Sequence, residues 1–238
     1  MQTEDPYWLK EAYEKSINNS DTGYMFRNNL FAKKLTILLY LQFGDSGKFL
    51  DYAGGYGVFV RLMRDIGFDF YWADKYTDNL FAQGFEYDSS QKYDAVTSFE
   101  VFEHFEDPVQ EIRNLFDLSD TIIFSTELHP NPLPKPEDWW YYGVEHGQHI
   151  ALYSKKTLQH IAQMVKCRFY SVAGLHILSK TPISLKHLKS TKYSRFGYHK
   201  WIGKKLHSKT WSDHQFMVSK ANDGITKDIL EAVSKHKN

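Results

Sequence analysis

The sequence has little cysteine: Cys167 is the only one among 238 residues. A single thiol excludes an intrachain disulfide framework and a cysteine-rich zinc site, and it fits a reducing, cytoplasmic location. Long apolar runs are also missing, because the longest, residues 35–43, contains Gln42 and falls short of the ~18 residues of a membrane span. The first ten residues are acidic and polar, unlike a secretory signal. These absences predict a cytoplasmic protein with no membrane span.

Net charge is absent too, since 29 basic residues balance 29 acidic ones, yet the two signs are separated along the chain. Residues 1–130 hold 22 acidic and 11 basic side chains, whereas residues 131–238 hold 7 and 18. Residues 182–210 contain eight Lys or Arg and no acid, interleaved with aromatic residues. This basic segment suits an anionic ligand, a partner surface or self-association, and equally a solvated face.

Short apolar segments alternate with helical ones along most of the chain. The expected strands are residues 48–53, 68–73, 81–86, 93–99, 121–126, 169–177 and 215–219. The expected helices are residues 27–43, 58–66, 108–116 and 154–165, with another from residue 6 and a short one in the tail from residue 221. The alternation is typical of an α/β fold whose mostly parallel sheet is covered by helices.

The sharpest motif is a glycine-rich turn between the first strand and the helix that follows, Asp51-Tyr-Ala-Gly-Gly-Tyr-Gly57. Small residues let a ligand approach the backbone at the carboxyl end of a strand. Asp74 ends the second strand, where a carboxylate can accept hydrogen bonds from two ribose hydroxyls, and nothing structural in the sequence requires an acid there. The glycine spacing differs from that of dinucleotide and Walker motifs, and Asp51 suits a cationic ligand better than a pyrophosphate.

With the run Tyr93-Asp-Ala-Val-Thr-Ser-Phe-Glu-Val-Phe-Glu-His104, these residues resemble the class I S-adenosylmethionine-dependent methyltransferases over residues 48–126. Ala53 stands where glycine is commoner. The outer segments, such as Tyr7-Trp8 and the aromatic block from residue 139, resemble more loosely a bacterial subgroup that modifies small molecules, sugars and surface polysaccharides.

The resemblance implies a Rossmann-like, seven-stranded, mostly parallel sheet with helices on both faces, an N-terminal helical extension and an inserted substrate loop. It divides one methyltransferase domain, residues 1–238, into four parts. These are a helical cap (1–45), a cofactor-binding core (46–127), a substrate loop (128–153) and the C-terminal half of the sheet with the basic segment (154–238).

The cofactor implied by the resemblance is S-adenosylmethionine, with S-adenosylhomocysteine as its product. Asp74 would bind the ribose, and residues after the third expected strand would contact the adenine. Arg27 would pair with the methionine carboxylate if the N-terminal helices fold over the cleft. The complete expected set is Asp51, Ala53, Gly55, Gly57, Asp74, Lys75, Tyr76, Phe85, Glu86, Phe99, Glu100 and Arg27.

The acceptor side should hold a general base, for which histidine is the natural side chain near neutral pH. His149 and His146 rank above His104 as candidates, because their proline-flanked loop follows the fifth strand. Aromatic faces with polar neighbours suit sugar rings, so the expected acceptor contacts are Trp139, Trp140, Tyr142 and Glu145. A lid packed on the sheet and a dimer contact are the alternatives for the aromatic run. The His146 and His149 pair lacks the i, i+4 spacing of helical metal sites, and thiolates are missing, so no metal is expected.

The expected activity is methyl transfer to a small molecule, a hydroxyl of a sugar or polysaccharide precursor. A phosphate or nucleotide carried by that acceptor would contact the basic segment. One alternative is an RNA methyltransferase that uses the basic segment, opposed by a pI near 7.2 and the lack of an RNA-binding module. The others are a non-catalytic scaffold with this fold and an NAD-dependent oxidoreductase. Oligomeric state stays open.

Overall fold

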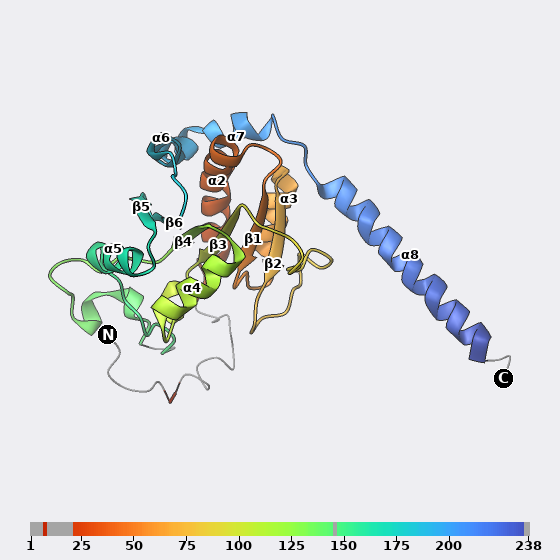
Figure 1. The fold of residues 1–238 in the computed structure, drawn as a ribbon, viewed down its shortest axis with the longest axis horizontal. Coiled ribbons are helices and arrows are strands. Elements are labelled where there is room, and N and C mark those ends of the chain that lie inside the picture. Colours follow the sequence, from red (N-terminus) through yellow and green to blue (C-terminus); the bar gives the residue numbers. More distant parts are fainter. Residues whose placement is uncertain (1–6, 9–20, 145–146, 236–238) are drawn as a thin grey trace.

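A computed structural model describes residues 7–8, 21–144 and 147–235, and from residue 223 onward only the course of the backbone. Its centre is a six-stranded sheet in the order β2-β1-β3-β4-β6-β5 (Figure 1). The strands are β1 (Lys48–Tyr52), β2 (Asp69–Ala73), β3 (Ala95–Phe99), β4 (Thr121–Ser125), β5 (Arg168–Val172) and β6 (Leu175–Ser179). The first four are parallel to one another, and β6 and β5 are added antiparallel.

Helices cover both faces of this sheet because its central strands are apolar on both sides. One core joins the sheet to α2 (Tyr24–Phe43) and α3 (Val58–Ile66), and a second joins it to α4 (Pro108–Leu118) and α5 (Lys155–Met164). Every residue of β4 and of β6 is buried. Burial on two faces explains their near-continuous apolar sequence, which parallel and central strands require.

The helix boundaries follow local sequence signals. The Asp107 side chain accepts hydrogen bonds from the Val109 and Gln110 amides at the start of α4, with Pro108 in the first turn. Ser154 caps α5 in the same way through the Thr157 amide. Gly67 follows α3 at φ +123°, and a Cβ there would meet the His207 carbonyl at 2.7 Å, so only glycine fits this close approach.

The expected count of seven strands is wrong for the described residues, which form six. Residues 81–86 make only an isolated bridge between Trp72 and Glu86. Residues 169–177, expected as one strand, are a hairpin that turns at Ala173 and Gly174, both at positive φ. The strand expected at 215–219 lies inside α8 (Thr210–Lys235), because a short apolar run cannot by itself distinguish a strand from a helix.

The start of α8 is attached to the sheet by a buried ion-pair network. Asp213 receives 2.8 Å hydrogen bonds from two arginines of α3, Arg61 and Arg64. The Arg64 guanidinium also lies 3.7 Å from the ring centroid of Phe85. Beyond this attachment, α8 projects away from the rest of the molecule (Figure 1).

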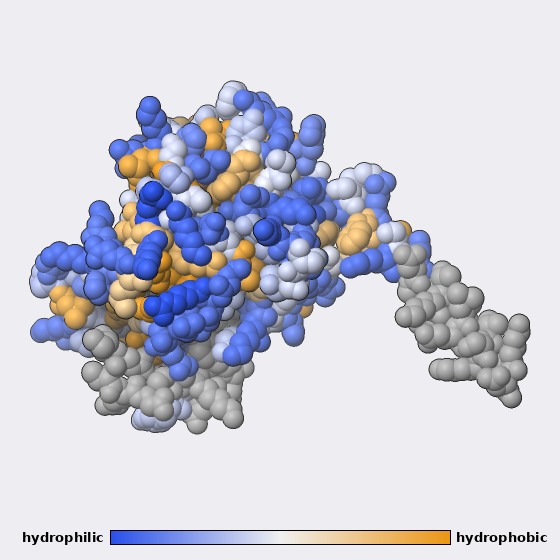
Figure 2. Space-filling model, viewed as in Figure 1, coloured by the Kyte–Doolittle hydropathy of each residue, from blue (hydrophilic) through white to orange (hydrophobic). Residues whose placement is uncertain are grey.

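The basic segment folds into three short helices that pack along α2: α6 (Leu185–Ser190), the 3-10 helix η4 (Thr191–Phe196) and α7 (Tyr198–Gly203). Lys205 lies over the rings of Tyr40 and Trp201. Tyr193, Phe196 and Trp201 stay exposed around a shallow hollow of about 500 Å³. Figure 2 shows that, on the face seen in Figure 1, apolar residues reach the surface in several separate areas. No helix in the described part of the chain is long and apolar enough to cross a bilayer.

Candidate active site

The candidate site lies at the carboxyl ends of β1, β2, β3 and β4, where the chain leaves the sheet in turns. After β1, Ala53, Gly55 and Gly57 all have positive φ, which allows a tight turn into α3. A Cβ on Gly54 would lie 2.8 Å from Asp51 Oδ2 and 3.0 Å from the Trp72 ring. The Trp72 indole of β2 donates a 2.7 Å hydrogen bond to the Gly55 carbonyl. The turn therefore depends on glycine both for its backbone angles and for the space beside Asp51.

Asp51 is a buried carboxyl group on the inner part of this turn. It is 3% exposed and faces Thr97 on β3, its register partner, whose hydroxyl donates a 2.6 Å hydrogen bond to Oδ1. Burial raises the pKa of Asp51 to about 7, with the charge of Asp74 adding to the rise and Thr97 opposing it. A carboxyl group held in this state favours a cationic ligand, because a positive charge would stabilise its ionised form.

Asp74 organises the turns that follow β1 and β2. Its Oδ2 accepts a 2.9 Å hydrogen bond from the Gly55 amide, and its Oδ1 accepts bonds from the Tyr76 and Thr77 amides at 2.8 and 2.9 Å. The expectation that nothing structural requires this acid is therefore wrong. The sequence hid this role because the amide partners come from two different turns.

Tyr24, the first residue of α2, belongs to the same cleft and was missed by sequence reasoning. Its pKa is raised to about 12 by burial first, and then by the charges of Asp51, Asp21 and Asp74, against an opposing backbone contact at Tyr56. The phenol thus lies close enough to Asp51 and to Asp74 for both charges to act on it. No local motif marks a tyrosine 27 residues upstream of Asp51, so only the position of α2 over the sheet shows its role.

Arg27 lies one turn further along α2, near the end of β3. It forms a bidentate ion pair with Asp21, with distances of 2.8 and 2.6 Å. Burial lowers the pKa of Arg27, but the Asp21 carboxylate, with Glu100 adding to it, outweighs burial and raises it overall. The N-terminal part of α2 therefore covers the cleft, while a direct role of Arg27 toward the cofactor stays a prediction.

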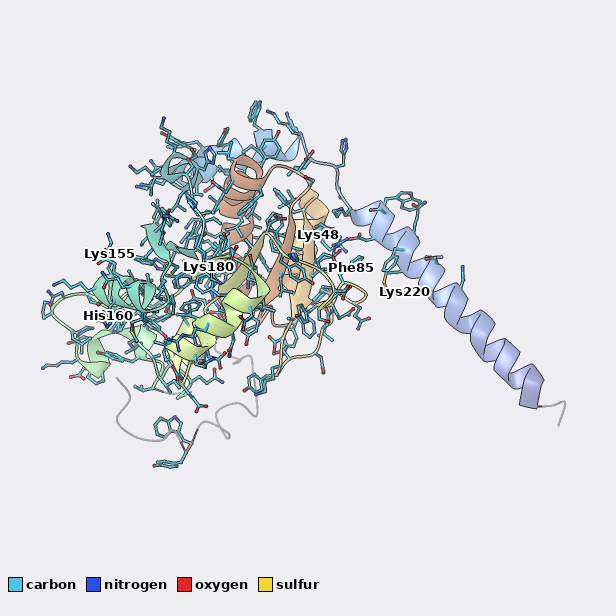
Figure 3. All side chains as sticks on the ribbon, in the orientation of Figure 1. Lys48, Phe85, Lys155, His160, Lys180 and Lys220 are labelled. Atoms are coloured by element: carbon cyan, nitrogen blue, oxygen red, sulfur yellow. The ribbon has the colours of Figure 1, made fainter. Side chains whose placement is uncertain are left out.

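The remaining expected cofactor residues lie in several environments. Lys75 and Tyr76 are exposed beside Asp74, with the Lys75 ammonium 5.0 Å from the Tyr76 ring centroid. Glu86 is exposed and accepts hydrogen bonds from Asn79 and Gly84. Figure 3 labels Phe85 between the β2 edge and the start of α8, where it packs on Arg64 and Phe216. The Phe85 ring is therefore committed to that contact, and its backbone amide and carbonyl bond to Ala82 and Trp72, so a role toward the adenine stays a prediction.

Glu100 follows β3 and begins the other half of the cleft. The Phe99 ring before it stacks on Phe31 of α2 at 4.3 Å, and Glu100 itself has φ +55°. Ser125 Oγ donates a 2.6 Å hydrogen bond to Glu100 Oε1, and the Tyr141 hydroxyl donates one of 3.2 Å to Oε2. This unusual backbone conformation thus holds the carboxylate between β4 and the loop that follows it.

Glu103 stands three residues later, in the 3-10 helix η1 (Phe102–His104), and is fully buried. Burial raises its pKa to about 8, helped by the charge of Glu100 and opposed by the hydroxyls of Tyr141 and Thr126. Among the described residues, neither carboxyl oxygen has a hydrogen bond of ordinary geometry. The Glu103 carbonyl accepts two further bonds, from the Ile150 and Ala151 amides at 2.8 and 2.9 Å.

These backbone bonds bring together two of the three candidate histidines. The rings of His104 and His149 meet edge to face, with centroids 5.0 Å apart. His149 Nδ1 donates a 2.6 Å hydrogen bond to the Tyr141 carbonyl, which fixes its tautomer. His146 and Glu145, the other expected residues of this loop, lie outside the described residues. Which histidine acts as a base stays a prediction.

The aromatic run after β4 divides between core and surface. Tyr141 is 1% exposed and Trp139 is 9% exposed, while Trp140, in the 3-10 helix η3 (Trp140–Tyr142), is 77% exposed. The Tyr142 hydroxyl donates a 2.7 Å hydrogen bond to the Pro134 carbonyl. Pro134 lies in the proline-rich part of the same loop, which also contains the 3-10 helix η2 (Pro136–Asp138). Trp8 donates a 2.9 Å bond to the Gly147 carbonyl beside His149. Of the aromatic contacts predicted for an acceptor, Trp140 is the side chain most open to solvent.

The basic segment lies away from both halves of the cleft. Lys205 packs over Tyr40, and Tyr40 is 16 residues along α2 from Tyr24, which corresponds to roughly 24 Å of helix. The expectation that this segment contacts a phosphate on a small acceptor is therefore not supported by its position in the fold.

Comparisons with known proteins agree with the fold described above. The family described as "Methyltransferase domain" matches residues 25–168. The plantazolicin methyltransferase BpumL, in complex with a monoazolic desmethyl analogue and SAH, is 13% identical with a TM-score of 0.55 over 84% of this chain and 88% of that one. A SAM-dependent methyltransferase from Thermotoga maritima is 8% identical with a TM-score of 0.51, over 73% of this chain and 100% of that one. At these identities the two solved structures establish a shared fold and nothing more. The search of curated proteins found no match to the sequence.

Proposed function

This chain belongs to the family of methyltransferase domains, and from that premise we propose that it transfers a methyl group from S-adenosylmethionine to an oxygen of a small acceptor molecule. The observation that carries the proposal is the pairing of a buried acid, Asp51, with a turn in which Gly54 keeps the space beside that acid clear. BpumL, which shares the fold, is described with the demethylated product of the same cofactor.

The residues of the cofactor half fit a ligand with this chemistry. Asp51 faces the cleft with a raised pKa, and the cationic amino group of a methionine moiety would offset that rise. Asp74 Oδ1 already accepts two backbone amides, whereas Oδ2 accepts only that of Gly55 and so retains a lone pair that a ribose hydroxyl can use. Tyr24 closes this side of the cleft from α2.

When bound, the cofactor supplies a sulfonium-activated methyl group that an acceptor oxygen displaces in line, which leaves S-adenosylhomocysteine and releases a proton from the acceptor. The chain's residues contribute position and environment to this reaction. Glu100, held by Ser125 and Tyr141, lies between the two halves, and buried side chains around it exclude water. In this proposal His149 or His104 accepts that proton, which the contact between their rings beside Glu103 supports.

We further propose a sugar or polysaccharide precursor as the acceptor. Carboxylates, imidazoles and phenols gather around Glu100 and His149, which suits a molecule with several hydroxyl groups. The exposed Trp140 face beside them can stack on a sugar ring. In this proposal residues 46–127 form the cofactor core, residues 128–153 the acceptor loop, and a cytoplasmic location agrees with the single cysteine.

The proposal is tested by calorimetric titration of S-adenosylhomocysteine into the wild type and into Asp51→Asn and Asp74→Asn. Loss of one charge-assisted contact should weaken binding by about 1.5–3 kcal/mol, or roughly one to two decades of affinity. Asp78→Asn, an exposed change of the same charge in the same loop, is the matched control and should leave the affinity unchanged.

Two results would contradict the proposal. One is a folded wild-type protein, free of copurified ligand, that binds no S-adenosylhomocysteine. The other is saturable binding of NAD, which would favour an oxidoreductase. With binding established, a panel of sugars, nucleotide sugars, peptides and RNA, followed by transfer of labelled methyl groups, identifies the acceptor class.

A further inference from the structure

Three potential metal ligands converge on the acceptor side of the cleft. Glu103, His104 and His149 each offer one ligand atom, and these atoms all lie within 4.8 Å of one another. They come from η1 and from the loop before α5, and His149 lies 45 residues after His104 in the sequence. Because the Ile150 and Ala151 amides both bond to the Glu103 carbonyl, main-chain hydrogen bonds fix the two segments to each other.

The carboxyl group of Glu103 gives the cluster a reason to bind a cation. It is fully buried, and neither of its oxygens has a well-formed hydrogen bond to a described residue. A buried acid in this state is destabilising unless a positive charge or strong donors compensate it. The Glu100 carboxylate, held by Ser125 and Tyr141, adds a second acidic group to this region.

The orientation of His149 fits a ligand. Its Nδ1 donates to the Tyr141 carbonyl at 2.6 Å, so Nε2 of the neutral ring carries a lone pair. Metal-binding histidines almost always donate their second ring nitrogen to a carbonyl or carboxylate, which fixes the ring and raises its basicity. The Tyr141 carbonyl therefore fixes the orientation of the His149 ring, which assigns Nε2 as the ligand atom of this residue.

The donor set also indicates which cations suit the cluster. Two imidazoles and one carboxylate favour first-row divalent transition metals, whereas magnesium and calcium prefer oxygen ligands. Three protein ligands leave positions for an outside molecule, as in catalytic sites. The sequence predicts no metal because it places His149 beside His146 and Glu145 on one loop. In the structure, His149 lies with Glu103 and His104 of η1 instead.

We propose that Glu103, His104 and His149 bind one divalent first-row transition cation, which in turn binds hydroxyl groups of the acceptor. The acceptor part of this inference rests on the function proposed above, whereas the metal site itself does not. A cation at this position would lower the pKa of a bound hydroxyl and present its oxygen toward the cofactor half of the cleft.

The test uses the full chain after treatment with a chelator and its removal. Co²⁺ is the probe, because its visible absorption reports both stoichiometry and ligand geometry. The wild type should bind one equivalent saturably, and Zn²⁺ should displace it. Glu103→Gln, His104→Gln and His149→Gln should each weaken Co²⁺ binding by about 100-fold or more. His160→Gln, on the exposed face of α5 (Figure 3), is the matched control and should bind as the wild type does.

The outcomes separate the metal proposal from the methyltransferase proposal. Wild-type protein that binds S-adenosylhomocysteine but shows no saturable Co²⁺ absorption overturns the metal site and leaves the function intact. Saturable Co²⁺ binding without cofactor binding supports the site and contradicts the function. Binding that survives all three single substitutions in folded variants also overturns the assignment. The wild-type titration decides even if Glu103→Gln fails to fold.

Discussion

The two halves of the cleft are built in different ways. The cofactor half is formed by neighbours in sequence: the turn after β1 and the turn after β2 are joined by Asp74, which bonds amides in both. The acceptor half is formed by segments far apart in sequence, with Glu100 and Glu103 on one side and the loop from Trp139 to Ala151 on the other. Local geometry constrains the first half, and tertiary contacts position the second. We therefore expect substitutions in one half to leave the other half largely unaffected.

The largest effect is expected from the glycine turn. Gly57→Val puts a side chain where φ is +83° and where a Cβ would already lie 3.0 Å from the Ala82 amide nitrogen. Strain of about 1–3 kcal/mol, together with displacement of the neighbouring loop, should weaken S-adenosylhomocysteine binding roughly 100-fold by calorimetry. Gly174→Val is the matched control, at φ +78° in the β5–β6 turn with open space around it. It should lower stability and leave cofactor affinity unchanged. Equal losses of affinity in both variants would contradict the local character of this half.

Asp51 should produce a smaller, pH-dependent effect. Its pKa is about 7 in the folded protein, above the ordinary value of 3.8, so ionisation destabilises the cofactor-free fold increasingly as the pH rises from about 4 to 7. Asp51→Asn removes that penalty and should raise the unfolding free energy above pH 7 by on the order of 1–3 kcal/mol, with the gain vanishing near pH 4. Thermal unfolding at a series of pH values measures it.

The same acid predicts the opposite trend for binding. Because an ionised Asp51 is the form that attracts a cationic ligand, wild-type affinity for S-adenosylhomocysteine should fall as the pH drops below 7. Asp51→Asn should bind weakly with a flatter pH profile. A stability gain in this variant that does not depend on pH would contradict the assigned titration.

Tyr141→Phe should change the acceptor half by about 1 kcal/mol. The substitution removes a buried hydroxyl that donates to Glu100 and contacts Thr126 at 3.2 Å. Denaturant unfolding should show this loss of stability, while the affinity for S-adenosylhomocysteine stays within about twofold. A tenfold or greater loss of cofactor affinity would show that the halves are coupled through Glu100.

The smallest effect is expected from the basic segment. Lys205→Ala removes a cation over Trp201 and Tyr40 and should leave cofactor affinity and transfer to a small acceptor within about twofold. Calorimetry measures the cofactor affinity, and the labelled-methyl assay compares transfer by the variant with transfer by the wild type. A clear loss of transfer would mean that the acceptor is long enough to reach from the cleft to this surface.

The contrast between local geometry and tertiary contacts also explains how much of the structure could be predicted from the sequence. The four parallel strands, the glycine turn and Asp74 follow from local patterns, and all are present in the structure. For the hairpin of β5 and β6 the sequence predicts a single strand, because Ala173 and Gly174 interrupt the apolar run too briefly. Tyr24 and the grouping of Glu103 with His149 could not be predicted, because α2 packing and two backbone hydrogen bonds create them. Nothing within a short window of sequence encodes those contacts.

The two hydrogen bonds from the Ile150 and Ala151 amides to the Glu103 carbonyl have an evolutionary consequence. It uses main-chain atoms only, so almost any residue at positions 150 and 151 preserves it. Substitutions at exposed positions such as Trp140 can then change which acceptor is recognised, without moving His149 relative to η1. The loop is anchored at its far end by chemistry that mutation rarely removes, which leaves its outer surface free to diversify.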